Sequence, residues 1–250
     1  MTTLSHLGKQ PGSVLVTGAS GGIGGAISRA FAGAGWCVGV HYRKDKASAE
    51  GVLDRIQRAG GCGTLYEADV RNAQSVEQMV GAFTRNSPPP LSFVCAAGVA
   101  GSHLLIKLPE DHWVDLMATN LTGLFHCLRA MAPPLQIQGG GSIVVLGSYA
   151  GYQGSPGQAA YAASKAGQVG LVKSAALEWG HENIRVNLVW PGWQKTKLSD
   201  EANPGKAGWR DHALHRSPAL DEVVRTVVHV AQMKDMSGQV WNCDSRSVFL

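Results

Sequence analysis

Residues 13–33 read SVLVTGASGGIGGAISRAFAG, and this stretch decides the fold. The apolar run Ser13 to Thr17 predicts a buried strand, which leads directly into a glycine-rich turn and then a helix that lasts to Gly33. Side chains in such a turn would keep the backbone from a pyrophosphate, whose charge is held by amides at the start of the helix. A turn without a ligand is the ordinary alternative, but the position after the first strand favours a nucleotide. The residues expected to contact it are Gly18, Ser20, Gly22, Ile23 and Gly24.

The second predicted strand, Cys37 to Tyr42, ends in Tyr42 and is followed by two cations, Arg43 and Lys44. An acidic side chain at this place would bind the ribose 2′-hydroxyl of NAD, whereas cations suit a 2′-phosphate. The ordinary alternative is that both cations lie in a solvated loop. We expect the cofactor to be NADP(H) rather than NAD(H).

Asp69 and Val70 follow the third predicted strand, Thr64 to Glu67. A carboxylate at a strand end suits the amino group of an adenine, and it equally suits the N-cap of the helix expected from Ala73 to Arg85. The sequence leaves both roles open.

Small residues, Ala97 and Gly98, come just after the fourth predicted strand, Leu91 to Cys95. They leave room for a flat cofactor to lie against the backbone.

Strands alternate with helices along the whole chain. Further strands are expected at Ser142 to Leu146, Ile184 to Val189 and Gln239 to Asn242. The pattern predicts one α/β domain over residues 1–250, with a Rossmann-type doubly wound parallel sheet of about seven strands, helices on both faces, and ligands at the carboxyl ends of the strands. The polar segment at about 193–218 contains Gly and Pro and is expected to form a substrate lid.

Composition narrows the class of protein. The net charge is +4 with scattered basic residues, which disfavours nucleic acid as a partner. No run approaches the roughly 20 apolar residues of a membrane span, and the N-terminus lacks the apolar core of a signal peptide, so a cytoplasmic protein is expected. The five cysteines include no C-x-x-C pair, which predicts buried free thiols in a reducing compartment and no metal site.

Ser148, Tyr161 and Lys165 form the candidate catalytic group. Tyr161 and Lys165 are four positions apart on a helix expected from about Gly157 to Gly180, so they share one face. A phenol ionises near pH ~10, and a nearby lysine cation lowers that pKa, which suits the phenol to acid–base catalysis. Ser148 follows the strand ending at Leu146, where its hydroxyl is free to bond a carbonyl oxygen.

Asn120 interrupts an apolar stripe on the helix expected from Pro109 to Gln138. A buried amide must be hydrogen-bonded, and asparagine is a poor helix former, so its presence suggests a function. A satisfied structural amide is the alternative. The stripe expected to face the core is Trp113, Leu116, Met117, Leu121, Leu124, Phe125 and Leu128.

Together these residues resemble the short-chain dehydrogenase/reductase family, and the resemblance runs from Ser13 to about Asp244. Thr17 to Gly24 is similar to the family's T-G-x-x-x-G-x-G turn. The adenine-side aspartate corresponds to Asp69, and the segment that holds the nicotinamide carboxamide corresponds to Pro191, Gly192 and Thr196. The catalytic tetrad corresponds to Asn120, Ser148, Tyr161 and Lys165.

The resemblance implies a mechanism. Tyr161 is the general acid in carbonyl reduction and the general base in alcohol oxidation. Lys165 lowers its pKa and holds the nicotinamide ribose hydroxyls, while Ser148 hydrogen-bonds the substrate oxygen. Asn120 steadies a water that links Lys165 to solvent. A homo-oligomer, a tetramer by this resemblance, is also implied.

Two stretches depart from the family pattern. Relatives often show N-N-A-G after the fourth strand, where this chain has Cys95-Ala96-Ala97-Gly98, so two amides that would stabilise the turn are missing. Many relatives end in V-D-G-G, where this chain has Cys243-Asp244-Ser245-Arg246.

The layout is similar to 3-oxoacyl-[acyl-carrier-protein] reductases, enzymes of fatty acid biosynthesis. It implies NADPH-dependent reduction of a ketone or a 3-oxoacyl thioester. Basic residues near the lid would then meet an acidic acyl carrier protein or a phosphopantetheine, or they are a solvated surface; they are Lys195, Lys197, Arg210 and Arg216. Two alternatives stay open: a dehydrogenase or reductase of another small alcohol or carbonyl compound, and a non-catalytic NADP(H)-binding sensor or scaffold.

Overall fold

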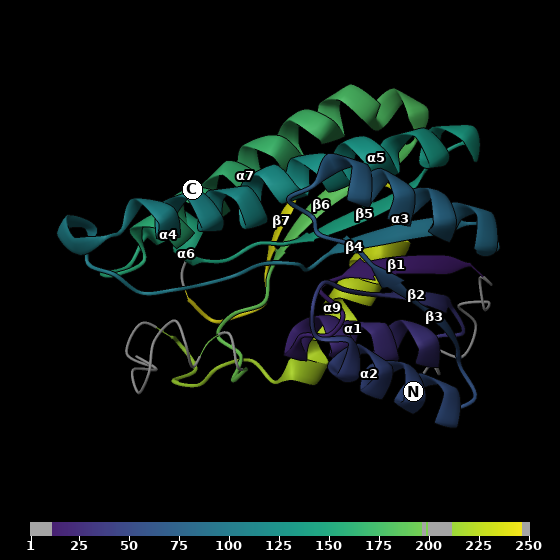
Figure 1. Ribbon diagram of the computed structural model, residues 1–250, viewed down its shortest axis with the longest axis horizontal. Helices are drawn as coiled ribbons and strands as arrows, with labels where there is room; N and C mark the ends of the chain where they lie inside the picture. The colour runs from purple at the N-terminus through teal and green to yellow at the C-terminus, as the bar shows by residue number, and fades with distance from the viewer. Residues whose placement is uncertain (1–11, 197–198, 200–211, 247–250) are drawn as a thin grey trace.

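The computed structural model describes residues 12–196, Ser199 and 212–246 of the chain. Within that part, seven strands form one parallel sheet in the order β3-β2-β1-β4-β5-β6-β7 (Figure 1). The strands are β1 Ser13–Thr17, β2 Cys37–Tyr42, β3 Cys62–Glu67, β4 Leu91–Cys95, β5 Gly141–Leu146, β6 Ile184–Trp190 and β7 Val240–Asn242. The expected doubly wound parallel sheet is therefore confirmed.

Helices cover both faces of the sheet. Figure 1 shows α3, α5 and α7 on one face and α1, α2 and α9 on the other. The α-helices are α1 Gly22–Gly33, α2 Lys46–Arg58, α3 Ala73–Asn86, α4 Glu110–Met117, α5 Gly123–Ile137, α6 Ala150–Gln153, α7 Ala159–Trp179 and α9 Leu220–Gln232. Short helical turns occur at η1 Leu105–Lys107, η2 Ala118–Thr122 and η3 Gly180–Glu182.

Each face of the sheet has its own apolar core, because successive residues of a strand point to opposite sides. Leu15 belongs to the core under α3, α5 and α7, whereas its neighbours Val14 and Val16 belong to the core under α1, α2 and α9. All three side chains are fully buried, as expected for a parallel sheet covered on both faces.

The strand order indicates which edge of the sheet binds ligands. β1 pairs with β2 on one side and with β4 on the other, so the chain winds outward in both directions from β1. A crevice opens at the carboxyl ends of strands where the winding reverses. The turns after β1 and β4 therefore meet at this edge.

The helix expected from Pro109 to Gln138 differs from the prediction. It is divided into α4, a π-helical turn at Ala118–Thr122 and α5. A π turn contains an extra residue and shifts the phase of the side chains that follow. Leu116, Leu124 and Leu128 of the expected stripe are buried, but Trp113 is 38 % exposed and Phe125 is 43 % exposed.

The prediction of five free thiols was wrong for two cysteines. Cys37 and Cys62 form a disulfide between β2 and β3. The parallel register pairs these two residues directly across the strands, which brings their sulfur atoms together. Cys95 and Cys127 are buried free thiols as expected, and Cys243 is free and partly buried. Among the described helices, none is long and apolar enough to span a membrane.

Candidate active site

The glycine-rich turn after β1 requires glycine at two of its positions. Gly18 has a φ of +68°, and a Cβ there would lie 2.8 Å from the backbone of Ala97. At Gly24 a Cβ would lie 2.3 Å from the carbonyl oxygen of Gly18. Gly18 therefore lets the turns after β1 and β4 approach closely, and Gly24 lets the glycine-rich turn close on itself.

The start of α1 suits an anion. Its N-cap, Gly21, has no side chain to occupy the free amides, and the first turn of the helix contains no acidic residue. Gly21 and Gly22 are exposed, and Ser20 and Ile23 are partly exposed. The positive end of the helix dipole is thus open to solvent, and these residues fit the pyrophosphate of a dinucleotide.

His41 was not singled out from the sequence, and it holds this turn in place. The amide of Gly18 donates a 2.8 Å hydrogen bond to Nδ1 of His41, and Nε2 lies 3.1 Å from the carbonyl oxygen of Ala68. Nδ1 must accept, so the neutral ring carries its proton on Nε2 and donates it to Ala68. Burial lowers the pKa of His41 to about 4. A histidine inside a predicted strand gives no sequence signal for this role.

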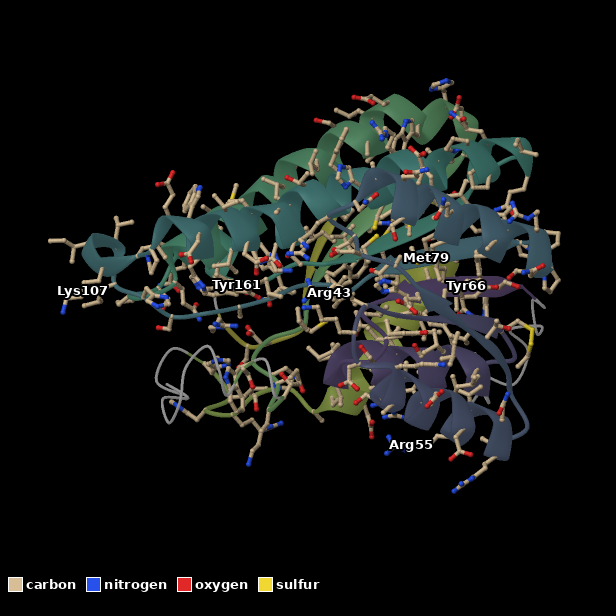
Figure 2. The ribbon with its side chains drawn as sticks, viewed as in Figure 1. Arg43, Arg55, Tyr66, Met79, Lys107 and Tyr161 are labelled. Atoms are coloured by element: carbon tan, nitrogen blue, oxygen red, sulfur yellow. A yellow bond between two sulfur atoms is a disulfide. The ribbon has the colours of Figure 1, made fainter. Side chains whose placement is uncertain are left out.

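Arg43 and Lys44 lie in the expected ribose corner at the end of β2, and both are at least partly exposed. The phenol of Tyr42 donates a 3.0 Å hydrogen bond to Oε2 of Glu67. Sequence reasoning missed this carboxylate, although Tyr42 and Glu67 are the last residues of β2 and β3 and are paired by register. Figure 2 shows Arg43 at the same end of the sheet as Tyr161.

Asp69 does not cap α3. The N-cap is Asn72, whose side chain accepts a 3.0 Å hydrogen bond from the amide of Ser75, so the capping alternative was wrong. The Asp69 carboxylate instead accepts hydrogen bonds from the guanidinium of Arg71, which lower its pKa. The adenine role of Asp69 stays a prediction. Val70 is buried beside it and its carbonyl oxygen lies 2.9 Å from Nδ1 of His126.

The side chain of Thr17 holds the turn after β4, where the two asparagines of the family pattern are missing. Its Oγ1 accepts hydrogen bonds from the amides of Ala96 at 3.1 Å and Ala97 at 3.2 Å. The same hydroxyl lies 3.5 Å from the carbonyl oxygen of Val94. The side chain of Cys95 is buried against Met131 rather than pointing at the turn. The turn and Gly98 are therefore held despite the departure from N-N-A-G.

Ser148 and Tyr161 are brought together at the carboxyl end of β5, as predicted. The two side chains share a hydrogen bond, which favours the phenolate, but burial raises the pKa of Tyr161 above its ordinary value of 10.0 and is the larger effect. The expected lowering of this pKa by Lys165 is not found. Nζ of Lys165 lies 5.8 Å from the centroid of the Tyr161 ring and donates a 2.8 Å hydrogen bond to the carbonyl oxygen of Leu146.

The pKa of Lys165 is also shifted. Its side chain is buried, and this burial lowers the pKa of its ammonium to about 8. The lysine can therefore lose its proton close to neutral pH, which suits a residue that takes part in proton transfer.

Asn120 lies in the π turn and is fully hydrogen-bonded. Its Oδ1 accepts from the amide of Val99 at 2.8 Å, and its Nδ2 donates to the carbonyl oxygen of Val99 at 2.9 Å and to Oγ of Ser164 at 3.0 Å. Ser164 Oγ in turn donates to the carbonyl oxygen of Tyr161 at 2.8 Å. The side chain thus ties the loop after β4 to α7. Its backbone carbonyl oxygen accepts from Gln168 on α7, a residue that sequence reasoning also missed.

Pro191 and Gly192 follow β6 at the same edge. Gly192 has a φ of +68°, and a Cβ there would lie 2.7 Å from Pro218 and 2.9 Å from Asp244. Thr196 reaches the cofactor turn, since a Cβ on Gly22 would lie 2.9 Å from its methyl group. The expected nicotinamide segment therefore meets the expected pyrophosphate turn. Most of the expected lid, 197–198 and 200–211, lies outside the described residues, as do Lys197 and Arg210.

Arg246 occupies the position at which many relatives have glycine. Its guanidinium lies 4.0 Å from the centroid of the Tyr149 ring and is paired with the fully buried carboxylate of Asp244. Tyr149 directly follows Ser148, and its ring also packs edge-on against Trp190 with centroids 5.9 Å apart. The last described residues of the chain therefore brace the turn that carries Ser148.

Comparisons with known proteins place this chain in a family. The sequence model of the short chain dehydrogenase family matches residues 13–207. A 3-oxoacyl-[acyl-carrier-protein] reductase of Staphylococcus aureus is 38% identical over 192 residues, which are 77% of this chain and 78% of the relative. The corresponding reductase of a Synechocystis species is 35% identical over 237 residues, which are 94% and 96% of the two chains.

Two solved structures have the same fold. An actinorhodin polyketide ketoreductase, solved with NADPH, has a TM-score of 0.87, 27% identity and 98% coverage of both chains. A dehydrogenase/reductase from Sinorhizobium meliloti has a TM-score of 0.85, 28% identity and 94% coverage of both chains. Because the family model spans most of the sequence and relatives at 35–38% identity cover most of its length, this chain belongs to the short-chain dehydrogenase/reductase family of NAD(P)-dependent oxidoreductases.

Proposed function

We propose that the protein reduces a ketone or a 3-oxoacyl thioester to the hydroxy compound with NADPH, and that Tyr161 is the proton donor. The observation that carries this proposal is the hydrogen-bonded pair Ser148 and Tyr161, which stands beside the buried Lys165 at the carboxyl end of β5. Bound NADPH would supply a hydride to the carbonyl carbon. The carbonyl oxygen gains a proton at the same time, so the products are an alcohol and NADP⁺.

The other catalytic roles are assigned to residues of this chain. Ser148 hydrogen-bonds the carbonyl oxygen and orients it toward the phenol of Tyr161. Tyr161 gives its proton to that oxygen, and a buried, neutral phenol, as its raised pKa indicates, is in the protonated form that reduction requires. The Lys165 ammonium stabilises the phenolate left behind.

The cofactor is held by residues along the same edge. The amides at the start of α1 take the pyrophosphate, Arg43 and Lys44 take the 2′-phosphate, and Asp69 takes the adenine side. Pro191, Gly192 and Thr196 hold the carboxamide end. Support for a 2′-phosphate comes from the two cations after β2 and from the ketoreductase of the same fold that was solved with NADPH.

The acyl thioester is favoured among the possible substrates because the relatives from Staphylococcus aureus and Synechocystis are 3-oxoacyl-[acyl-carrier-protein] reductases. Lys195 and Arg216 are exposed cations near the two ends of the lid segment, where an acidic carrier protein would approach. The test is a substrate panel run with NADPH: acetoacetyl thioesters, with and without a carrier protein, against free ketones and aldehydes. NADPH binding without turnover of any member would contradict the proposed reaction and favour a sensor.

We also propose that the chain forms a homotetramer. Phe125 on α5 is 43% exposed and Leu177 on α7 is 85% exposed, and apolar side chains of this kind favour burial against another subunit. Light scattering should give a mass of four 26.3 kDa chains. A monomer would contradict this proposal.

A further inference from the structure

Gln168 is a buried polar residue inside the catalytic network. It lies on α7, one turn beyond Lys165, and it is only 2% exposed. Its Nε2 donates a 2.7 Å hydrogen bond to the backbone carbonyl oxygen of Asn120. Its Oε1 accepts a longer hydrogen bond, 3.4 Å, from Nζ of Lys165. One side chain therefore connects two members of the expected tetrad.

The position of this amide conflicts with one implied feature of the site. By the family resemblance Asn120 steadies a water that links Lys165 to solvent, but here a protein amide joins Lys165 Nζ to the Asn120 carbonyl oxygen. A water can accept a proton and release another, whereas a carboxamide has a fixed donor and a fixed acceptor. A buried amide is tolerated at this place because both of its ends are hydrogen-bonded.

We propose that Gln168 is a positioning residue for Lys165: its amide takes the place of the bridging water and fixes the lysine ammonium between the ends of β5 and the π turn. This inference rests on the proposed function, because the catalytic role of Lys165 is part of that proposal. Oε1 of Gln168 can only accept, so it stabilises the charged form of the lysine. The proton that Lys165 exchanges during turnover must then leave by a path other than the Asn120 carbonyl.

Few groups face Nζ of Lys165 besides Gln168. β5 contributes the carbonyl oxygen of Leu146 at 2.8 Å, and α7 contributes the phenol of Tyr161, whose ring centroid is 5.8 Å away. The loop after β4 contributes Gly98, where a Cβ would lie 3.9 Å from Nζ. Within the described part of the chain, no charged side chain is among the causes of the shifted pKa of Lys165, which is due to burial. A change at Gln168 should therefore be visible in this pKa.

The direct test follows the titration of the Lys165 side chain by NMR of isotope-labelled lysine, with the signal assigned from Lys165→Met. Gln168→Leu removes an acceptor from the ammonium and should lower the pKa of Lys165 by about one pH unit. Gln168→Glu places a carboxylate beside the ammonium and should raise the pKa by about one pH unit or more. Shifts in opposite directions support the proposal, and an unchanged pKa in Gln168→Leu overturns it.

The controls separate this role from general packing. Gln136→Leu removes a glutamine amide that binds Glu182 on the exposed surface of α5, and it should leave the pKa of Lys165 unchanged. Thermal melting shows whether each variant is folded, and Gln168→Met, which has no acceptor and a similar length, replaces Gln168→Leu if that variant unfolds. A shift in Gln136→Leu equal to that in Gln168→Leu would overturn the proposal.

Kinetics then connect the shift to turnover. With an active substrate from the panel, the alkaline limb of the kcat/KM profile should move to lower pH in Gln168→Leu and to higher pH in Gln168→Glu, by the same amounts as the NMR titration. Lack of turnover by the unmodified protein would count against the proposed reaction alone, because the NMR titration decides the role of Gln168 without a substrate.

Discussion

The amide of Gly18 donates a 2.8 Å hydrogen bond to Nδ1 of His41, so a buried imidazole on β2 holds the first residue of the glycine-rich turn. This bond requires the neutral ring, and the carbonyl oxygen of Ala68 receives the remaining N–H. A proton on Nδ1 would place two donors against each other. The shape of the cofactor turn therefore depends on His41 staying uncharged.

We expect the free energy of unfolding to depend on pH through His41. The pKa of His41 is about 4 in the folded protein and near 6.5 in the unfolded chain, so on acidification the unfolded chain takes up the proton first. Stability should be complete above pH 6.5 and fall as the pH decreases toward 4, by about 2 kcal/mol between pH 7 and pH 5. Urea unfolding at these two pH values, compared with His41→Asn, measures this contribution. His181→Asn changes an exposed histidine and should lose as much stability between pH 7 and pH 5 as the unmodified protein. An equal loss in His41→Asn would contradict the prediction.

Tyr161→Phe should nearly abolish turnover and leave NADPH binding intact. The substitution keeps the ring but removes the proton donor, and removal of a positioned acid typically lowers the rate on the order of 10²- to 10⁴-fold. Stopped-flow turnover with an active substrate and NADPH fluorescence titration measure the two effects. Tyr152→Phe on α6 is a matched control that should retain activity. Retention of most of the activity in Tyr161→Phe would show that another group supplies the proton.

Removing a cation of the ribose corner should weaken binding of NADPH but not of NADH. Arg43→Ala should raise the Kd for NADPH about tenfold, because a charge-assisted hydrogen bond to the 2′-phosphate is lost. Fluorescence titration with both cofactors is the measurement. Arg58→Ala, which removes an exposed arginine paired with Asp54 at the far end of α2, serves as the control. Tighter binding of NADH than NADPH by the unmodified protein would overturn the cofactor assignment.

The Cys37–Cys62 disulfide predicts a thiol count. In denaturant without reductant, thiol titration should find three groups, Cys95, Cys127 and Cys243, and it should find five after reduction. Cross-linking β2 to β3 restricts the unfolded chain, so reduction should lower the free energy of unfolding by about 3 kcal/mol. Cys37→Ser should show the same loss and no further response to reductant. Five thiols before reduction would show that the bond is absent from the purified protein.

The order of strands and helices could be predicted because it depends on local signals. Ser13 to Thr17 and Leu91 to Cys95 are apolar runs that end at glycine or small residues, and both strands have the expected bounds. Ser148, Tyr161 and Lys165 could also be predicted, because spacing along one helix and one strand end brings them together. These features do not require knowledge of which distant segments meet.

The features that were missed depend on contacts between distant segments. The disulfide follows from the register of β2 against β3, and the Tyr42–Glu67 hydrogen bond follows from the same register at the other end of the strands. Gln168 gives no signal in sequence, because only the fold brings the carbonyl oxygen of Asn120 within 2.7 Å of it. The pKa of Tyr161 was predicted in the wrong direction because the burial of the phenol is not visible from its spacing to Lys165.

The π turn at Ala118–Thr122 has a consequence for insertions and deletions. A π turn has one residue more than the α-helical turn, so removing any single residue within it would restore a regular helix. Every side chain of α5 would then rotate by about 100° relative to α4, which would turn Leu124 and Leu128 away from the core. Asn120 would lose its place opposite Val99 and Gln168. Apart from Asn120, whose side chain is part of the site, we therefore expect this segment to accept changes of residue type more readily than any change of length.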